Sequence, residues 1–113
     1  MPYITHSRNN PQLLSYCTRM GRLFGSCVVQ RRGSKSLEKT MIDARSKGFS
    51  KIIIIGKSST GGAAATLIKT HKAGGYYSIL SKYVISKSGA GMVIKGKHGA
   101  TDGKKNIVEE ATD

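Results

Sequence analysis

The chain has 113 residues, of which 38% are hydrophobic and 14 are glycine, so it suits one globular domain with its own core and not a disordered segment. Lys and Arg number 19 against 6 Asp and Glu, a net charge of +13. No apolar run approaches the roughly 18 residues of a membrane-spanning helix. The first residues lack the apolar core of a secretory signal, so we expect a cytoplasmic protein.

The first half of the chain alternates short β-prone segments with amphipathic helical patterns. We expect strands over residues 3–5, 26–30 and 52–55, and helices over 11–24 and 37–47. Asn10 and Pro11 fit the start of the first helix, and Ser36 can cap the second. Gly25 and Gly48 mark the two helix ends.

The run of four isoleucines at 52–55 organises this half. Apolar residues that do not alternate with polar ones indicate a strand buried on both faces, which therefore needs cover on both sides. The two upstream helices can supply it, through Leu13, Cys17, Met20 and Phe24 in the first and Leu37, Met41, Ile42 and Ala44 in the second. Helices between strands predict crossovers and a sheet that is parallel at least in part.

The second half has no long helical pattern. Residues 64–70, 76–86 and 91–95 are β-prone and are expected to add antiparallel strands to the sheet. The fold class is therefore α/β, with a mixed sheet whose β-α-β-α-β first half is followed by antiparallel strands. Residues 1–96 form the expected domain, and 97–113 a polar, partly flexible C-terminal segment in which Ile107 and Val108 could dock weakly.

Catalytic and metal-binding patterns find little support. Gly56-Lys57-Ser58 follows an apolar strand, but a P-loop needs a glycine where Lys51 stands. The three histidines, His6, His71 and His98, have no ligands at metal-binding spacing, and Cys17 and Cys27 suit buried free thiols. We expect no metal, no cofactor and no enzymatic activity, although a Ser/His/Asp or Cys/His arrangement is not excluded by sequence alone.

Positive charge is segregated along the chain. Up to Thr101 there are 17 basic residues against only Glu38 and Asp43, a net charge of +15. This imbalance favours a polyanionic partner, with nucleic acid first. An anionic membrane surface fits less well, because the basic residues do not follow one amphipathic helix. A merely solvated surface would normally mix both signs.

The candidate binding residues lie in turns that follow strands. If the first strands run parallel, these turns emerge at one edge of the sheet and gather cations that can bind phosphates. The predicted nucleic-acid-binding residues are Ser7, Arg8, Arg31, Arg32, Lys35 and Lys57. Tyr76, Tyr77 and Tyr83 lie in a strand-like run beside Lys82 and Lys87; they could stack RNA bases, but such tyrosines more often pack against the core.

Several short motifs, in this order, resemble the Brix-domain family, above all its short archaeal members. They are Ile4-Thr-His-Ser-Arg8, the helix opening Gln12-Leu-Leu-Ser, Arg32-Gly-Ser-Lys-Ser-Leu37, Asp43-Ala-Arg-Ser-Lys-Gly48 and the isoleucine strand ending at Gly56. The matching positions are Ser7, Arg8, Arg32, Gly33, Ser36 and Leu37. The resemblance implies a fold similar to the anticodon-binding domain of class II synthetases, and a role in ribosome assembly through RNA binding.

We therefore predict a non-enzymatic ribosome-biogenesis factor that binds rRNA or its precursor through the basic turns, with ribosome-assembly proteins as further candidate partners. One alternative is a general nucleic-acid-binding protein of the chromatin or RNA-coating type, which would also bind duplex DNA. Another is a small enzyme acting on nucleotides or RNA, which would show turnover or a tightly bound nucleotide.

Overall fold

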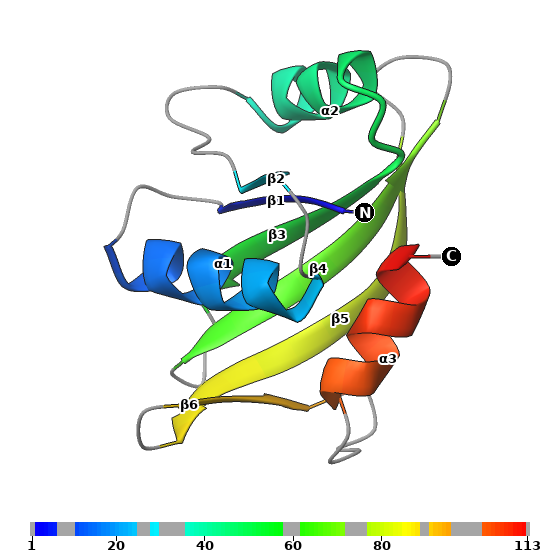
Figure 1. The fold of residues 1–113 in the computed structure, drawn as a ribbon. Helices are drawn as coiled ribbons and strands as arrows, with labels where there is room; N and C mark the ends of the chain where they lie inside the picture. Colours follow the sequence, from blue (N-terminus) through cyan, green and yellow to red (C-terminus); the bar gives the residue numbers. More distant parts are fainter. Residues whose placement is uncertain are drawn as a thin grey trace.

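A mixed sheet of six strands, in the order β2-β1-β3-β4-β5-β6, forms the centre of the described structure (Figure 1). The computed structural model describes residues 2–6, 11–24, 28–29, 36–57, 62–71, 77–88, 91–95 and 103–112. Its elements are β1 (Tyr3–His6), α1 (Pro11–Phe24), β2 (Val28–Val29), α2 (Leu37–Ser46), β3 (Lys51–Lys57), β4 (Ala63–Thr70), β5 (Tyr77–Ser88), β6 (Gly91–Lys95) and α3 (Gly103–Thr112).

The pairing of the strands confirms the predicted fold class. β1 lies between β2 and β3 and is parallel to both, because α1 and α2 carry the chain back between successive strands. The pairs β3–β4, β4–β5 and β5–β6 are antiparallel. The β-α-β-α-β first half and the antiparallel second half are thus both present.

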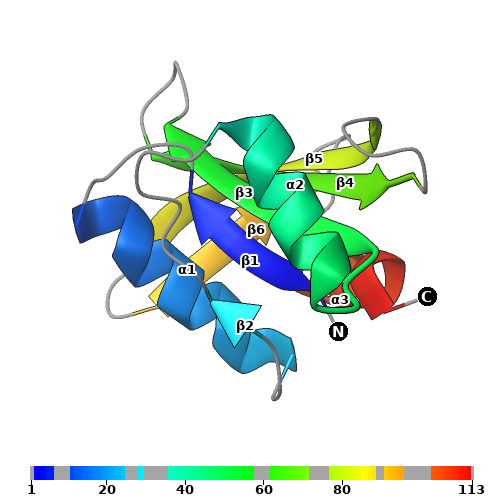
Figure 2. The same cartoon turned by 90° about the horizontal axis from the view of Figure 1, so that it is seen from above.

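The isoleucine strand is covered on both faces, as its sequence predicts. On one side, the α1 face, Ile53 and Ile55 pack with Leu13, Tyr16, Cys17 and Met20. On the other, the α2 face, Ile52 and Ile54 pack with Met41, Ala44 and Leu37. Figure 2 shows that α1 and α2 lie on different sides of the central strands. A strand with two buried faces explains why no polar residue interrupts the run.

The ends of α2 confirm the predicted caps. The Ser36 hydroxyl accepts a hydrogen bond from the Lys39 amide at 3.2 Å. After the helix, Gly48 has φ +90°, and the Phe49 amide donates to the Ala44 carbonyl at 2.9 Å in a Schellman arrangement.

The apolar face of α2 differs from the prediction at one position. Ile42 is 49% exposed, and Thr40 is buried instead. The Thr40 hydroxyl donates to the Ser36 carbonyl at 2.9 Å, so its polar atom is satisfied within the helix. The buried stripe of α2 is therefore rotated towards Thr40 and away from Ile42.

The sequence predicts no helix near the C-terminus, yet α3 forms there and packs firmly. Ile107 and Ala111 belong to the core cluster of the α1 face, beside Ile85 and Ile94. The expectation of weak docking for Ile107 is therefore wrong, since its side chain is fully buried. Where the domain ends along the chain stays a prediction.

Candidate nucleic-acid interface

The parallel part of the sheet brings three strand ends to one edge. β1, β2 and β3 run in the same direction, with Ile4 opposite Val29 and His6 opposite Ile55. β1 leads to α1 on one face, whereas β2 leads to α2 on the other. In open α/β sheets a crevice for ligands forms where neighbouring strands send their connections to opposite faces. Here that point is the carboxyl edge of β1 and β2.

The predicted binding residues follow these strand ends in the sequence. Lys57, expected in the loop after Gly56, is instead the last residue of β3 and is exposed to solvent. The remaining five lie outside the described residues: Ser7, Arg8, Arg31, Arg32 and Lys35. The structure thus aligns the strands that lead into the basic turns, while the joint placement of the six side chains stays a prediction.

His6, at the carboxyl end of β1, is a feature of this edge that the sequence did not reveal. Its side chain is 1% exposed, and neither ring nitrogen has a hydrogen-bond partner. It faces the same side of the sheet as Ile4, two residues earlier, so strand alternation would have placed it inward. An imidazole can donate a hydrogen bond to a phosphate oxygen, which makes a buried, unsatisfied histidine notable beside a candidate anion site. Among the described residues no three His, Cys, Asp or Glu side chains gather to hold a metal.

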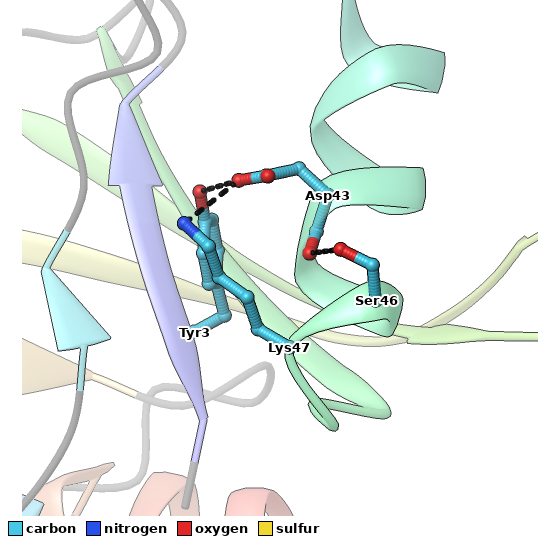
Figure 3. A network of polar contacts seen from close by, with 4 residues as sticks. All are labelled: Tyr3, Asp43, Ser46 and Lys47. Carbon is cyan, nitrogen blue, oxygen red and sulfur yellow. Dashed lines mark hydrogen bonds and ion pairs between the residues drawn. The ribbon is translucent and has the colours of Figure 1, made fainter.

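Asp43, one of the two acids before Thr101, is held in a contact between α2 and β1 (Figure 3). Its carboxylate accepts a hydrogen bond from the Tyr3 hydroxyl at 3.0 Å and lies 3.2 Å from the Lys47 ammonium. Burial, and then the hydrogen bond to Asp43, raises the pKa of Tyr3 above its ordinary value. This contact lies at the amino end of β1, so Asp43 is away from the carboxyl edge.

Glu110, on α3, is likewise bound internally. Its carboxylate accepts hydrogen bonds from the hydroxyls of Tyr83 and Ser81, the latter at 2.5 Å. The Lys51 ammonium donates to the Glu110 carbonyl at 2.5 Å, close to the C-terminal end of the helix, where a cation is favourable. Burial, and then the bond to Glu110, raises the pKa of Tyr83 to about 12. The spacing of Ile107 and Ala111 is the one signal that could have predicted this helix.

The tyrosines do not act as one stacking surface. Tyr83 is 2% exposed on the α1 face and belongs to the core, so the core-packing interpretation is correct for it. Tyr77 is 43% exposed and lies opposite Thr70 on the α2 face. Tyr76 lies outside the described residues. A platform built from all three is therefore excluded.

The comparisons with known proteins support the fold. No family model matches the chain, and no curated protein sequence matches it. Among solved structures, Mil, an archaeal Imp4-like protein, has a TM-score of 0.57 at 20% identity, covering 74% of this chain and 50% of that one. A "probable ribosomal biogenesis protein" from Aeropyrum pernix K1 has a TM-score of 0.65 at 15% identity, covering 75% and 47%. The chain spans about half the length of these two proteins and shares their fold over that half.

No helix in the described ranges is both long and apolar enough to cross a membrane.

Proposed function

We propose that this protein is a non-enzymatic ribosome-biogenesis factor that binds rRNA or its precursor in the cytoplasm. Two independent lines support the proposal. The solved structures that share its fold include a "probable ribosomal biogenesis protein", and the sequence motifs resemble the Brix-domain family. The net charge of +13 fits a polyanionic partner.

The observation that carries the proposal is the common edge of the three parallel strands. Five of the six predicted residues follow β1 or β2 in the sequence, and Lys57 is the last residue of β3; the carboxyl ends of these three strands lie side by side. Five of the six are cations, namely Arg8, Arg31, Arg32, Lys35 and Lys57. Lys and Arg contacts to phosphates supply most of the affinity of proteins for nucleic acids.

The helices strengthen the same edge. α1 and α2 both begin there, and the positive ends of their dipoles favour phosphate groups. The first turn of α1 contains no acidic residue that would already neutralise that end, whereas the first turn of α2 contains Glu38. Phosphate binding is therefore better supported near α1. Specificity would come from RNA shape, since the major groove of A-form RNA is too narrow for side chains to enter.

The basic turns can be tested by removing two arginines together. Arg31→Ala with Arg32→Ala should weaken binding to an rRNA fragment by about tenfold or more at moderate salt, because two phosphate contacts are lost. The slope of log K against log salt should flatten by about 1.4 to 1.8. Fluorescence anisotropy at several NaCl concentrations measures both quantities.

A matched control removes the same charge elsewhere. Lys69 and Lys82 are exposed on β4 and β5, away from the β1–β2 edge, so Lys69→Ala with Lys82→Ala should leave RNA affinity nearly unchanged. An equal loss in both variants would favour the second candidate, a general nucleic-acid-binding protein that the high net charge also supports. In that case duplex DNA should compete as well as RNA. Unchanged affinity in the arginine variant would contradict the proposed site.

A further inference from the structure

β5 exposes large apolar side chains at positions where a half-covered strand normally has polar ones. Tyr77, Ile79 and Val84 are 43%, 53% and 45% exposed, and Leu80, at a bulge, is 39% exposed. Apart from these, Ile42 on α2 is the one large apolar side chain so exposed among the described residues. Exposed apolar side chains that gather in one place indicate a surface for another molecule.

The strand register places three of these side chains on the α2 face. Ile79 lies opposite Ile68, which is buried in the cluster under α2. Val84 lies opposite Ala64 of β4 and Lys95 of β6, and Tyr77 lies opposite Thr70. We name Tyr77, Ile79, Lys82, Val84 and Lys95 the open β5 face. Because paired residues share a side of the sheet, all five point away from α1 and α3.

The two faces of the sheet differ in how far helices cover them. On the α1 face, α1 packs near β1 and β3, while α3 covers Ile85 and Ile94 of β5 and β6. On the α2 face, α2 packs on Ile52 of β3 and Ile68 of β4 but leaves Ile79 of β5 exposed. Figure 2 shows α2 over the central strands, with β5 extending beyond it. The described structure therefore has room for one more helix beside α2.

The charge of the surface indicates which helix would fit. Lys82, two residues before Val84 on β5, and Lys95, opposite Val84 on β6, are both exposed, and the open β5 face contains no acidic residue. A second copy of this chain fits poorly, because each copy has a net charge of +13 and the lysines of the two faces would repel one another. Aliphatic side chains such as Ile79 and Val84 cannot stack bases as aromatic ones do, so RNA fits less well than a protein.

We propose that the open β5 face binds an amphipathic helix of a partner protein, with an apolar stripe flanked by Asp and Glu. The stripe would cover Ile79 and Val84, as the apolar residues of α2 cover Ile52 and Ile68. The acidic flanks would pair with Lys82 and Lys95. This surface is separate from the carboxyl edge of β1 and β2, so it would allow RNA and a protein to bind at the same time.

The test uses a synthetic peptide of defined pattern. It has about five helical turns, roughly 18 residues, with Leu on one face and Glu on the other. The full-length protein, labelled with ¹⁵N, is titrated with this peptide, with a scrambled peptide of the same composition, and with a version carrying Lys for Glu. We expect the patterned acidic peptide to bind best and to shift the backbone amide signals of β5 and β6.

Matched variants show whether the contact is the one proposed. Val84→Ser should weaken binding of the acidic peptide by about fivefold, because the peptide then no longer buries the apolar surface of a half-exposed valine. Ile42→Ser removes an equally exposed aliphatic side chain from α2 and should have no effect. Lys82→Glu should weaken binding of the acidic peptide and improve that of the Lys-containing one.

Four results would overturn the proposal. The scrambled peptide could bind as tightly as the patterned one, which would show attraction by charge alone. The signals of β5 could remain unshifted. A single-stranded RNA of roughly 20 nucleotides could shift the same signals and lose affinity in Val84→Ser, which would make the face an RNA surface. Sedimentation could show a dimer that Val84→Ser breaks, which would make the partner a second copy.

Discussion

Cys17 shows how burial governs the chemistry of one residue. It lies in α1, is fully buried, and directs its thiol towards the Thr5 carbonyl at 3.6 Å. Burial raises the pKa of Cys17 from an ordinary value of 9.0 to about 12, since a thiolate is poorly solvated in the core. The side chain is therefore a structural thiol and not a reactive one.

This shift predicts a loss of stability at alkaline pH. Below pH 9 the thiol is protonated in both the folded and the unfolded state, so its contribution to the free energy of unfolding is fully present. Between pH 9 and about 12 the unfolded chain ionises first, and the free energy of unfolding falls by up to about 1.4 kcal/mol per pH unit. Urea unfolding of the wild type and of Cys17→Ala at pH 8 and pH 10 measures the effect.

Cys17→Ala should be less stable than the wild type at pH 8, because it leaves a small cavity. Its deficit should shrink by about 1 kcal/mol at pH 10, since the variant has no thiol to ionise there. The pKa of Tyr83 is also raised to about 12, but its effect on the free energy of unfolding is the same in the wild type and in Cys17→Ala and therefore cancels in the comparison. A deficit that stays constant between the two pH values would contradict the assignment.

At the scale of elements, two glycines with positive φ differ in what a side chain would cost. At one of them a side chain would meet only backbone strain, and at the other it would also meet a steric contact. Gly48, after α2, has φ +90°, and a Cβ there would meet nothing within 4 Å. Gly62, before β4, has φ +71°, and a Cβ there would lie 2.7 Å from the carbonyl oxygen of Ile85 in β5. The second position is restricted twice, by its backbone conformation and by its neighbour.

We predict that Gly48→Ala lowers the free energy of unfolding by about 1 kcal/mol, the cost of a left-handed conformation. Gly62→Ala should cost about 2 to 4 kcal/mol, because β4 or β5 must also shift to relieve the contact. Urea unfolding of the two variants gives the comparison, with Gly48→Ala as the control for strain. Equal losses would show that β4 and β5 adjust freely around residue 62.

Most elements could be predicted because local signals agreed with the final packing. Ser36, Gly48 and the four isoleucines each have a local physical role that the structure confirms. α3 was missed because its apolar residues stand in a short polar segment, and contact with Ile85 and Ile94 stabilises it. The exposure of Ile42 depends on how α2 crosses the sheet, which its sequence alone does not determine.

The tyrosines of β5 show a second limit of pattern reading. Tyr77 and Tyr83 are six residues apart, so a regular strand would place both on one face. Leu67 pairs with Ser81 but Ile68 pairs with Ile79, which leaves Leu80 as an extra residue in a bulge. The bulge reverses the alternation, so Tyr83 enters the core and Tyr77 faces outward. In the candidate site, the parallel order predicted the common edge. The alternation of β1 could have placed His6 inward beside Ile4, but the lack of hydrogen-bond partners at its ring nitrogens depends on the packing around it.

At the scale of the whole molecule, charge acts on folding and on binding in opposite ways. The chain has a net charge of +13, and the structure has extents of 40 × 28 × 26 Å. Cations this close repel one another in the folded state, whereas the unfolded chain spreads them apart. The Debye length falls from about 10 Å at 0.1 M salt to about 3 Å at 1 M, so salt screens much of this repulsion.

We therefore predict opposite salt dependences for stability and for RNA binding. Between 0.05 and 0.5 M NaCl the free energy of unfolding should rise by about 1 kcal/mol as self-repulsion is screened. Over the same range RNA affinity should fall steeply, because released counterions no longer favour the complex. Lys69→Ala with Lys82→Ala, which lowers the net charge to about +11, should show a smaller gain in stability with salt. A stability that stays flat or falls with NaCl would mean that local ion pairs already neutralise the surface, and a high net charge would then no longer favour a polyanionic partner.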